Sequence, residues 1–170
     1  MNLKSIIGIV AILSVSLFAQ EPYSWGNVRM DGGGFVSAVI AHPNQEGLFY
    51  ARTDVGGVYR FDSQAQKWIP LMDFVSQEDV GLYGTESFAI DPKNPGRLYV
   101  MGGTSYFSQG KTAILRSEDY GATFEVVDVS SLWKAHGNGM GRQTGEKLAV
   151  DPKKSEIVLC GTRRDGLFKS

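Results

Sequence analysis

One aspartate has a sequence context that could support catalysis. Asp54 stands shortly before Gly56 and Gly57, between two apolar runs, residues 48–51 and 58–61, that are predicted as β-strands. Because a pair of glycines lets the backbone turn sharply, we expect Asp54 at the mouth of a tight strand-to-strand connection and not on a sheet face. Two interpretations are open: the carboxylate caps its own turn, or it is a catalytic group on a rigid loop.

Other reactive side chains are sparse. The single cysteine, Cys160, excludes an internal disulfide, and its apolar neighbours predict a small buried hydrophobic residue. The two histidines, His42 and His136, are far apart in the sequence and have no metal-ligand spacing around them. The sequence therefore contains neither a zinc pattern nor a cysteine-nucleophile constellation, and we expect no metal or organic cofactor.

The first residues have the pattern of a targeting segment. Lys4 precedes an apolar run of 13 residues, 6–18, which is short for a membrane span but typical of a signal-peptide core. We expect residues 1–19 to be a signal peptide, with cleavage after Ser16 or retention as an N-terminal anchor as the alternatives. The remaining residues, 20–170, would then be a soluble exported chain, secreted or periplasmic, without a membrane partner.

The charge balance argues against nucleic acid as a partner. The whole sequence of 170 residues has a net charge of −1, and removal of Lys4 with the targeting segment leaves 16 basic against 18 acidic residues, a net charge of −2. Such a chain lacks the basic footprint that a nucleic-acid-binding protein presents to phosphates.

A repeat organises the apolar runs. Three apolar segments end in His-Pro or Asp-Pro, at Pro43, Pro92 and Pro152, and these prolines are 49 and 60 residues apart. Each segment is followed by a second and a third short apolar run, and in the first two units by a fourth. Proline ends the strand before it, and four short strands per unit at this period are typical of β-propeller blades. We therefore predict an all-β fold of about two and a half four-stranded blades.

The second unit contains a turn with a recognisable pattern. Residues 117–124 resemble the Asp-box, which is found in sialidases, sortilin-type receptors and several glycosidase propellers. In such a turn the aspartate, here Asp119, accepts backbone N–H groups, and the glycine, here Gly121, takes a φ value that other residues rarely adopt. The aromatic residue, Phe124, fills the core of the blade. The pattern indicates architecture and says little about function.

The expected topology sorts the connections onto two faces. Strands in a blade run alternately up and down, so the connection with Asp54 shares a face with its counterparts and with the long segments between units. On that face lie residues 54–57, 72–85, 102–111, 129–145 and 162–165, and on the other face lie the short turns 43–47, 92–97 and 152–156. The aromatic and charged residues of the long connections suit a carbohydrate-binding surface, with a protein-binding face as the alternative. Candidate sugar contacts are Tyr83, Trp133 and Arg142.

Several ordered motifs resemble one enzyme family. The segments that carry the resemblance are 31–35 (DGGGF), 50–57 (YARTDVGG), 68–71 (WIPL), 82–87 (LYGTES) and 141–152 (GRQTGEKLAVDP). Together they resemble glycoside hydrolase family 74, which contains xyloglucan-specific endo-β-1,4-glucanases and oligoxyloglucan reducing-end-specific cellobiohydrolases. The resemblance covers residues 23–170, with a mild departure at Asp31, where the family often has glycine.

The resemblance implies a function and a role for Asp54. Family members are built from two seven-bladed propellers with the glucan in the cleft between them, and they hydrolyse xyloglucan with inversion. Asp54 matches the aspartate that acts as general base, whereas the general acid, an aspartate of the second propeller, matches no position of this sequence. The resemblance thus implies xyloglucan, a plant cell-wall polysaccharide, and a second propeller of the same parent chain as partners. It also implies that residues 20–170 are an incomplete first propeller, inactive alone.

Other classes remain open at this point. A non-catalytic Asp-box propeller that binds glycan or protein would use the same architecture. A sialidase would need an arginine cluster that grips a carboxylate and a tyrosine nucleophile, and the sequence suggests no such arrangement. Arg52 is predicted to form an ion pair within the blade, with contact to Asp54 as the alternative.

Overall fold

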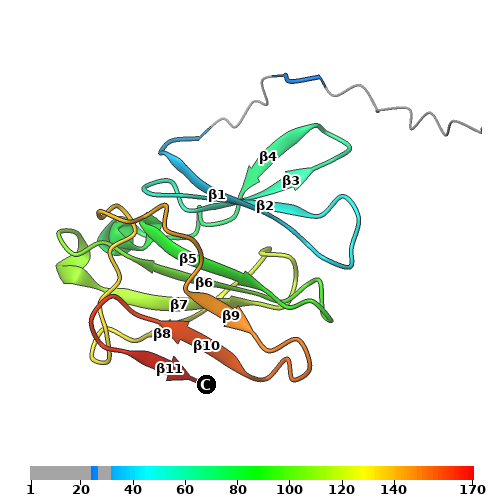
Figure 1. Cartoon of the computed structure of the whole chain (residues 1–170). Coiled ribbons are helices and arrows are strands. Elements are labelled where there is room, and N and C mark those ends of the chain that lie inside the picture. The colour runs from blue at the N-terminus through cyan, green and yellow to red at the C-terminus, as the bar shows by residue number, and fades with distance from the viewer. Residues whose placement is uncertain (1–23, 27–31) are drawn as a thin grey trace, which may run out of the picture.

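The regular secondary structure is almost entirely antiparallel β-sheet. The structure, a computed structural model, describes residues 24–26 and 32–170, and its strands form three sheets of four, four and three strands. Figure 1 shows the sheets stacked in the order of the chain, which confirms the predicted all-β architecture of successive blades. The predicted signal segment, residues 1–19, and Asp31 lie outside the described residues. None of the helices within the described ranges is long and apolar enough to cross a membrane.

Each sheet is a meander of consecutive strands. The first contains β1 (Val36–Ala41), β2 (Phe49–Thr53), β3 (Val58–Asp62) and β4 (Lys67–Pro70). The second contains β5 (Thr85–Ile90), β6 (Leu98–Gly103), β7 (Thr112–Ser117) and β8 (Glu125–Asp128). The third contains β9 (Leu148–Val150), β10 (Val158–Gly161) and β11 (Leu167–Lys169). The first strand of every sheet ends just before its His-Pro or Asp-Pro pair, as the repeat predicts.

The middle sheet differs from the prediction in one strand. The sequence pattern places a connection from residue 102 onward, but β6 continues through Gly102 and Gly103, and both pair with β7. A Cβ atom on Gly102 would lie 2.5 Å from the carbonyl oxygen of Leu82. The bare backbone therefore lets β6 continue beneath η1 (Gln77–Tyr83), a 3-10 helix that the pattern does not predict; a second, η2 (Ser108–Gly110), follows β6.

Two apolar cores hold the three sheets together. The core between the first and second sheets contains side chains that are at most 2% exposed, including Tyr50, Val58, Phe88, Leu98, Val100 and Leu115. The core between the second and third sheets includes Met101, Trp133, Leu148 and Cys160. Burial of a large apolar side chain contributes about 1.5–3 kcal/mol, so these cores fix how the sheets stack and where their connections meet.

The turn between β7 and β8 is closed by its aspartate. Asp119 accepts the Thr123 hydroxyl at 2.6 Å and the Thr123 N–H at 2.9 Å, and the Ser117 hydroxyl donates to it at 2.7 Å. These hydrogen bonds, those from Thr123 foremost, lower the pKa of Asp119 to about 2. Gly121 has a φ of +85°, and Phe124 packs against the core between the first two sheets. The turn is thus built from the interactions that its sequence predicts.

The connections divide between the two ends of the sheets as predicted. In Figure 1 the long connections gather at the left end and the short turns at the right end. Backbone hydrogen bonds hold the long connections together: Gly57 N–H donates to the carbonyl oxygen of Tyr83 at 2.9 Å, and Gly137 N–H donates to that of Gly103, at the end of β6, at 2.8 Å. They form one continuous surface, here called the loop face, made of residues 54–57, 71–84, 104–111, 129–147 and 162–166.

Candidate active site on the loop face

Asp54 does not cap its own turn. The residue follows directly after β2, and the turn is closed by Thr53, whose hydroxyl oxygen accepts the Gly56 N–H at 2.8 Å and lies 3.1 Å from the Gly57 carbonyl oxygen. The Asp54 carboxylate bonds to a different segment: its Oδ1 accepts the Phe35 N–H at 2.8 Å. The turn-capping interpretation is therefore wrong, because the carboxylate takes no part in closing the connection.

Glycines allow residues 33–35, just before β1, to pack closely against the connection between β2 and β3. Gly34 has a φ of +104°, and a Cβ atom there would lie 3.0 Å from Asp54 Oδ1. A Cβ atom on Gly56 would lie 2.1 Å from the carbonyl oxygen of Gly33. The two glycine clusters therefore pack backbone against backbone, and this close approach allows the N–H of Phe35 to reach the carboxylate.

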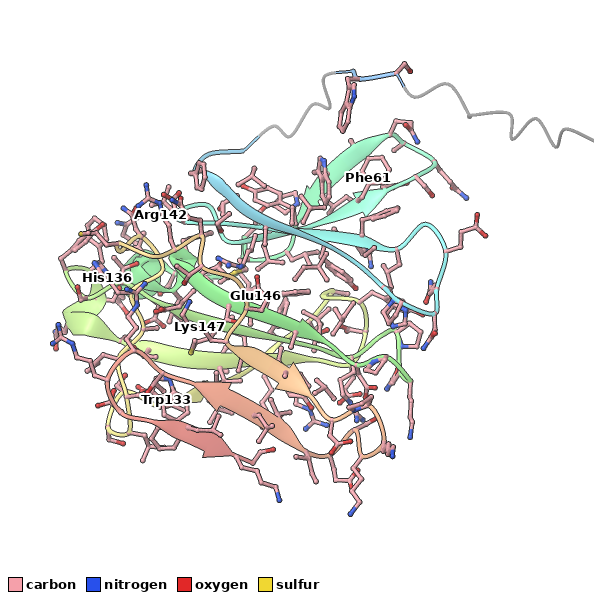
Figure 2. The ribbon with its side chains drawn as sticks, viewed as in Figure 1. Phe61, Trp133, His136, Arg142, Glu146 and Lys147 are labelled. Atoms are coloured by element: carbon pink, nitrogen blue, oxygen red, sulfur yellow. The ribbon has the colours of Figure 1, made fainter. Side chains whose placement is uncertain are left out.

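Arg142 reaches the other oxygen of the same carboxylate. Its Nε lies 3.1 Å from Asp54 Oδ2, and the Asp54 side chain is only 9% exposed. The guanidinium carbon lies 5.6 Å from the centre of the Phe35 ring, within the range of a cation–π contact. Of the residues predicted from the sequence, the structure thus brings Asp54 and Arg142 together. The loop before β9 reaches back to the first sheet to do so (Figure 2).

One anchor of this loop is an ion pair that Arg52 forms with Glu146. This side chain is 1% exposed, and its Nε donates to Glu146 Oε1 at 2.6 Å. Its Nη1 also donates to the carbonyl oxygen of Arg142 at 3.1 Å and to the Ser37 hydroxyl at 2.8 Å. Arg52 therefore joins β1 and β2 to the loop that presents Arg142. The predicted ion pair exists, but Arg52 pairs with the long loop before the third sheet.

The second anchor is centred on Glu86 in β5. This carboxylate is buried, and it pairs with Arg163 Nε and accepts the backbone N–H of His136. Arg163 Nη1 donates in turn to the carbonyl oxygen of Met140 at 2.6 Å. Glu86 and Arg163 thus hold the same loop from the side of the third sheet. Sequence reasoning did not single out either residue.

The other two predicted sugar contacts lie apart from the Asp54–Arg142 pair. Tyr83 ends η1 and is half-buried; burial, followed by the charge of Asp73, raises the pKa of Tyr83. Its carbonyl oxygen accepts the Gly57 N–H, so it borders the Asp54 connection through its backbone. Trp133 is buried in the core, with its ring centre 4.5 Å from that of Phe168 (Figure 2). The structure therefore places Tyr83 at the margin of the site and Trp133 within the packing.

Cys160 is a core residue, as predicted. Its thiol is buried, and burial, with a smaller effect of the Glu86 charge, raises the pKa of Cys160 to about 11. A thiol with this pKa is almost wholly protonated at neutral pH and is a poor nucleophile. Across the described ranges, 24–26 and 32–170, no group of three or more His, Cys, Asp or Glu side chains has a metal-binding arrangement.

Curated relatives of the chain are xyloglucanases. No protein-family model matches the chain. The oligoxyloglucan-reducing end-specific xyloglucanase of Emericella nidulans is 45% identical over 158 residues, which cover 93% of this chain and 19% of that protein. The xyloglucanase Xgh74A of Acetivibrio thermocellus is 38% identical over 174 residues, which cover 98% of this chain and 20% of that protein. The chain thus spans about a fifth of the length of these relatives.

Solved structures show the same relationship. The crystal structure of the Niastella koreensis GH74 enzyme matches with a TM-score of 0.79 and 53% identity, covering 85% of this chain and 21% of that chain. The GH74 xyloglucanase from Xanthomonas campestris matches with a TM-score of 0.77 and 47% identity, covering 88% of this chain and 21% of that chain. Sequence and fold therefore agree on the same group of enzymes.

Proposed function

The chain belongs to glycoside hydrolase family 74, and from this membership we propose that the whole protein is an exported enzyme that hydrolyses the β-1,4-glucan backbone of xyloglucan. The geometry of Asp54 supports this proposal independently of the relatives. Asp54 is a nearly buried carboxylate on the loop face, and its two oxygens are held by separate segments, Phe35 and Arg142. Such a fixed carboxylate on a rigid connection is what a general base requires.

The proposed mechanism is inversion with Asp54 as the base. The Phe35 N–H holds one carboxylate oxygen by a hydrogen bond, the Arg142 guanidinium pairs with the other by charge, and each oxygen keeps lone-pair capacity for a water molecule. In an inverting glycosidase a second carboxyl group stands roughly 6.5–9.5 Å from the base, which leaves room for that water between base and sugar. We assign this general acid to a second propeller of a longer protein. On this proposal the 170 residues alone bind glucan at most and do not hydrolyse it.

The experiment that tests this function follows the anomer of the product. We expect the full-length gene product to release oligosaccharides from xyloglucan, and proton NMR during the first minutes should show the α-anomer before mutarotation. Inversion at a β-linked carbon gives this result, whereas a retaining enzyme gives the β-anomer first. Binding of xyloglucan without any hydrolysis would instead identify a non-catalytic propeller, and initial β-anomer would overturn the assignment of Asp54 as base.

We expect Arg142→Ala to lower kcat on xyloglucan by roughly tenfold to a hundredfold with little change in KM, because it removes a group that orients the base. Arg142→Lys should recover part of kcat, since an ammonium can still approach Asp54 Oδ2. Arg164→Ala is the matched control, because Arg164 is exposed on the same face in the connection before β11. A rise in KM at unchanged kcat would show that Arg142 contacts the sugar instead.

A further inference from the structure

An exposed tyrosine on the loop face is held on three sides. Tyr106, in the connection between β6 and β7, is 57% exposed. Its hydroxyl oxygen accepts the Asn138 side-chain amide at 2.7 Å. Its ring packs edge to face with Phe107 at 4.9 Å and with His136 at 5.2 Å between centroids. A ring covered on both faces could not stay more than half exposed, so at least one part of its π-face remains open.

The groups that hold Tyr106 are themselves fixed to the fold. The Nδ1 of His136 accepts the Ser105 N–H at 3.3 Å, and the backbone N–H of His136 donates to the buried carboxylate of Glu86. Arg163 Nη2 donates to the carbonyl oxygen of His136 at 3.3 Å. The aromatic cluster therefore rests on the Glu86–Arg163 pair, the same anchor that supports the loop before β9.

Tyr106 and the proposed base, Asp54, both contact the loop before β9. Asn138, which holds the tyrosine, is four residues before Arg142, which holds Asp54. Two successive turns join them: Gly139 N–H donates to His136 at 2.7 Å, and Arg142 N–H donates to Gly139 at 3.2 Å. Four residues span at most about 14 Å, and Figure 2 shows His136 and Arg142 on the same end of the sheets. A polysaccharide that follows this loop away from Asp54 would reach the tyrosine.

We infer that Tyr106 is a stacking platform for a pyranose ring of the glucan, at a position separate from the cleaved bond. A β-linked glucose ring carries its hydroxyls around the rim and presents C–H groups on its faces, which complement the negative face of an aromatic ring. A tyrosine that is already immobilised loses little conformational entropy when the sugar binds. The inference rests on the proposed function, because the substrate class comes from there.

The test measures binding in the absence of turnover. In the full-length Asp54→Ala protein, Tyr106→Ala should weaken xyloglucan binding in affinity electrophoresis on the order of tenfold, and Tyr106→Phe should stay within about twofold. Asn138→Ala removes the same hydrogen bond as Tyr106→Phe and keeps the ring, so it should also stay within about twofold. Phe49→Ala is the control, because Phe49 begins β2 at the opposite end of the sheets and is also exposed.

Each outcome decides the inference. If Tyr106→Ala binds like its parent, or if Tyr106→Phe is as weak as Tyr106→Ala, stacking is excluded. If the Asp54→Ala parent itself does not bind xyloglucan, the platform is excluded together with its substrate. Weakened binding in Tyr106→Ala alongside a wild-type protein that hydrolyses nothing would sustain the platform and overturn the hydrolase. Should Tyr106→Ala not fold, Tyr106→Leu takes its place as a variant without an aromatic face, and a Tyr106→Leu protein that binds like its parent would overturn the inference.

Discussion

Replacement of Asp54 by alanine in the full-length protein is expected to lower kcat on xyloglucan by at least about 10³-fold and to leave KM within a few-fold. Removal of a positioned general base costs typically 10²–10⁴-fold, and here water is the nucleophile that the carboxylate must activate. KM should hardly change, because the carboxylate stabilises the transition state and not the bound sugar. Initial rates of reducing-end release, measured over a range of xyloglucan concentrations, give both constants.

A control variant and a chemical rescue accompany the Asp54 experiment. Asp165→Ala removes an exposed carboxylate from the equivalent connection of the third sheet, and its kcat should match the wild type. Sodium azide should partly restore cleavage to Asp54→Ala, because a small anion can occupy the vacated space and attack the sugar without a base. The product is then a glycosyl azide with no new reducing end, so this cleavage is followed by mass spectrometry of the oligosaccharides. Turnover by Asp54→Ala within tenfold of wild type would remove Asp54 from the mechanism.

The second large effect is expected on stability. Arg52→Met should lower the free energy of unfolding by about 2 kcal/mol, because it leaves the Glu146 carboxylate, whose side chain is 22% exposed, without the buried cation that pairs with it. It also removes the Nη1 group of Arg52, which donates to the carbonyl oxygens of both Thr85 and Arg142. Urea unfolding followed by tryptophan fluorescence measures this loss, and kcat should fall as well, since the loop with Arg142 loses an anchor.

A surface pair and a double variant are the controls for Arg52. Lys111→Met breaks the pair with Asp79, whose two side chains are 29% and 34% exposed, and should cost less than about 1 kcal/mol. Combining Arg52→Met with Glu146→Leu should cost less than the sum of the single changes, because no unpaired charge is left behind. Equal losses for Arg52→Met and Lys111→Met would show that burial of the pair adds nothing.

The sheets could be predicted because their signals are local. Each blade repeats an apolar strand, a His-Pro or Asp-Pro turn and a second strand within about 20 residues, and these signals need no knowledge of distant contacts. Asp119, Gly121 and Thr123 likewise form a turn whose hydrogen bonds stay within eight residues. The topology then placed Asp54 on the correct face, since strand direction alternates whatever the side chains are.

The contacts of the site could not be predicted in the same way. Arg52 and Glu146 are 94 residues apart, and Glu86 and Arg163 are 77 residues apart, so no spacing in the sequence pairs them. For Trp133 the local pattern was misleading. A tryptophan on a long connection suggested a sugar contact, but the indole packs in the core. Tyr106, which the structure holds open to solvent, carries no mark in the sequence that separates it from its neighbours.

The reach of Arg142 back to the first sheet sets an order of events during synthesis. Asp54 and Phe35 emerge from the ribosome early and can meet as soon as β1 and β2 pair. Arg142 follows Asp54 by 88 residues, and its anchors Glu146 and Arg163 come later still. A nascent chain can therefore fold its first sheet well before the carboxylate is fully oriented. The reactive geometry is completed only when the third sheet begins to form, so the order of these residues along the chain delays the assembly of the base.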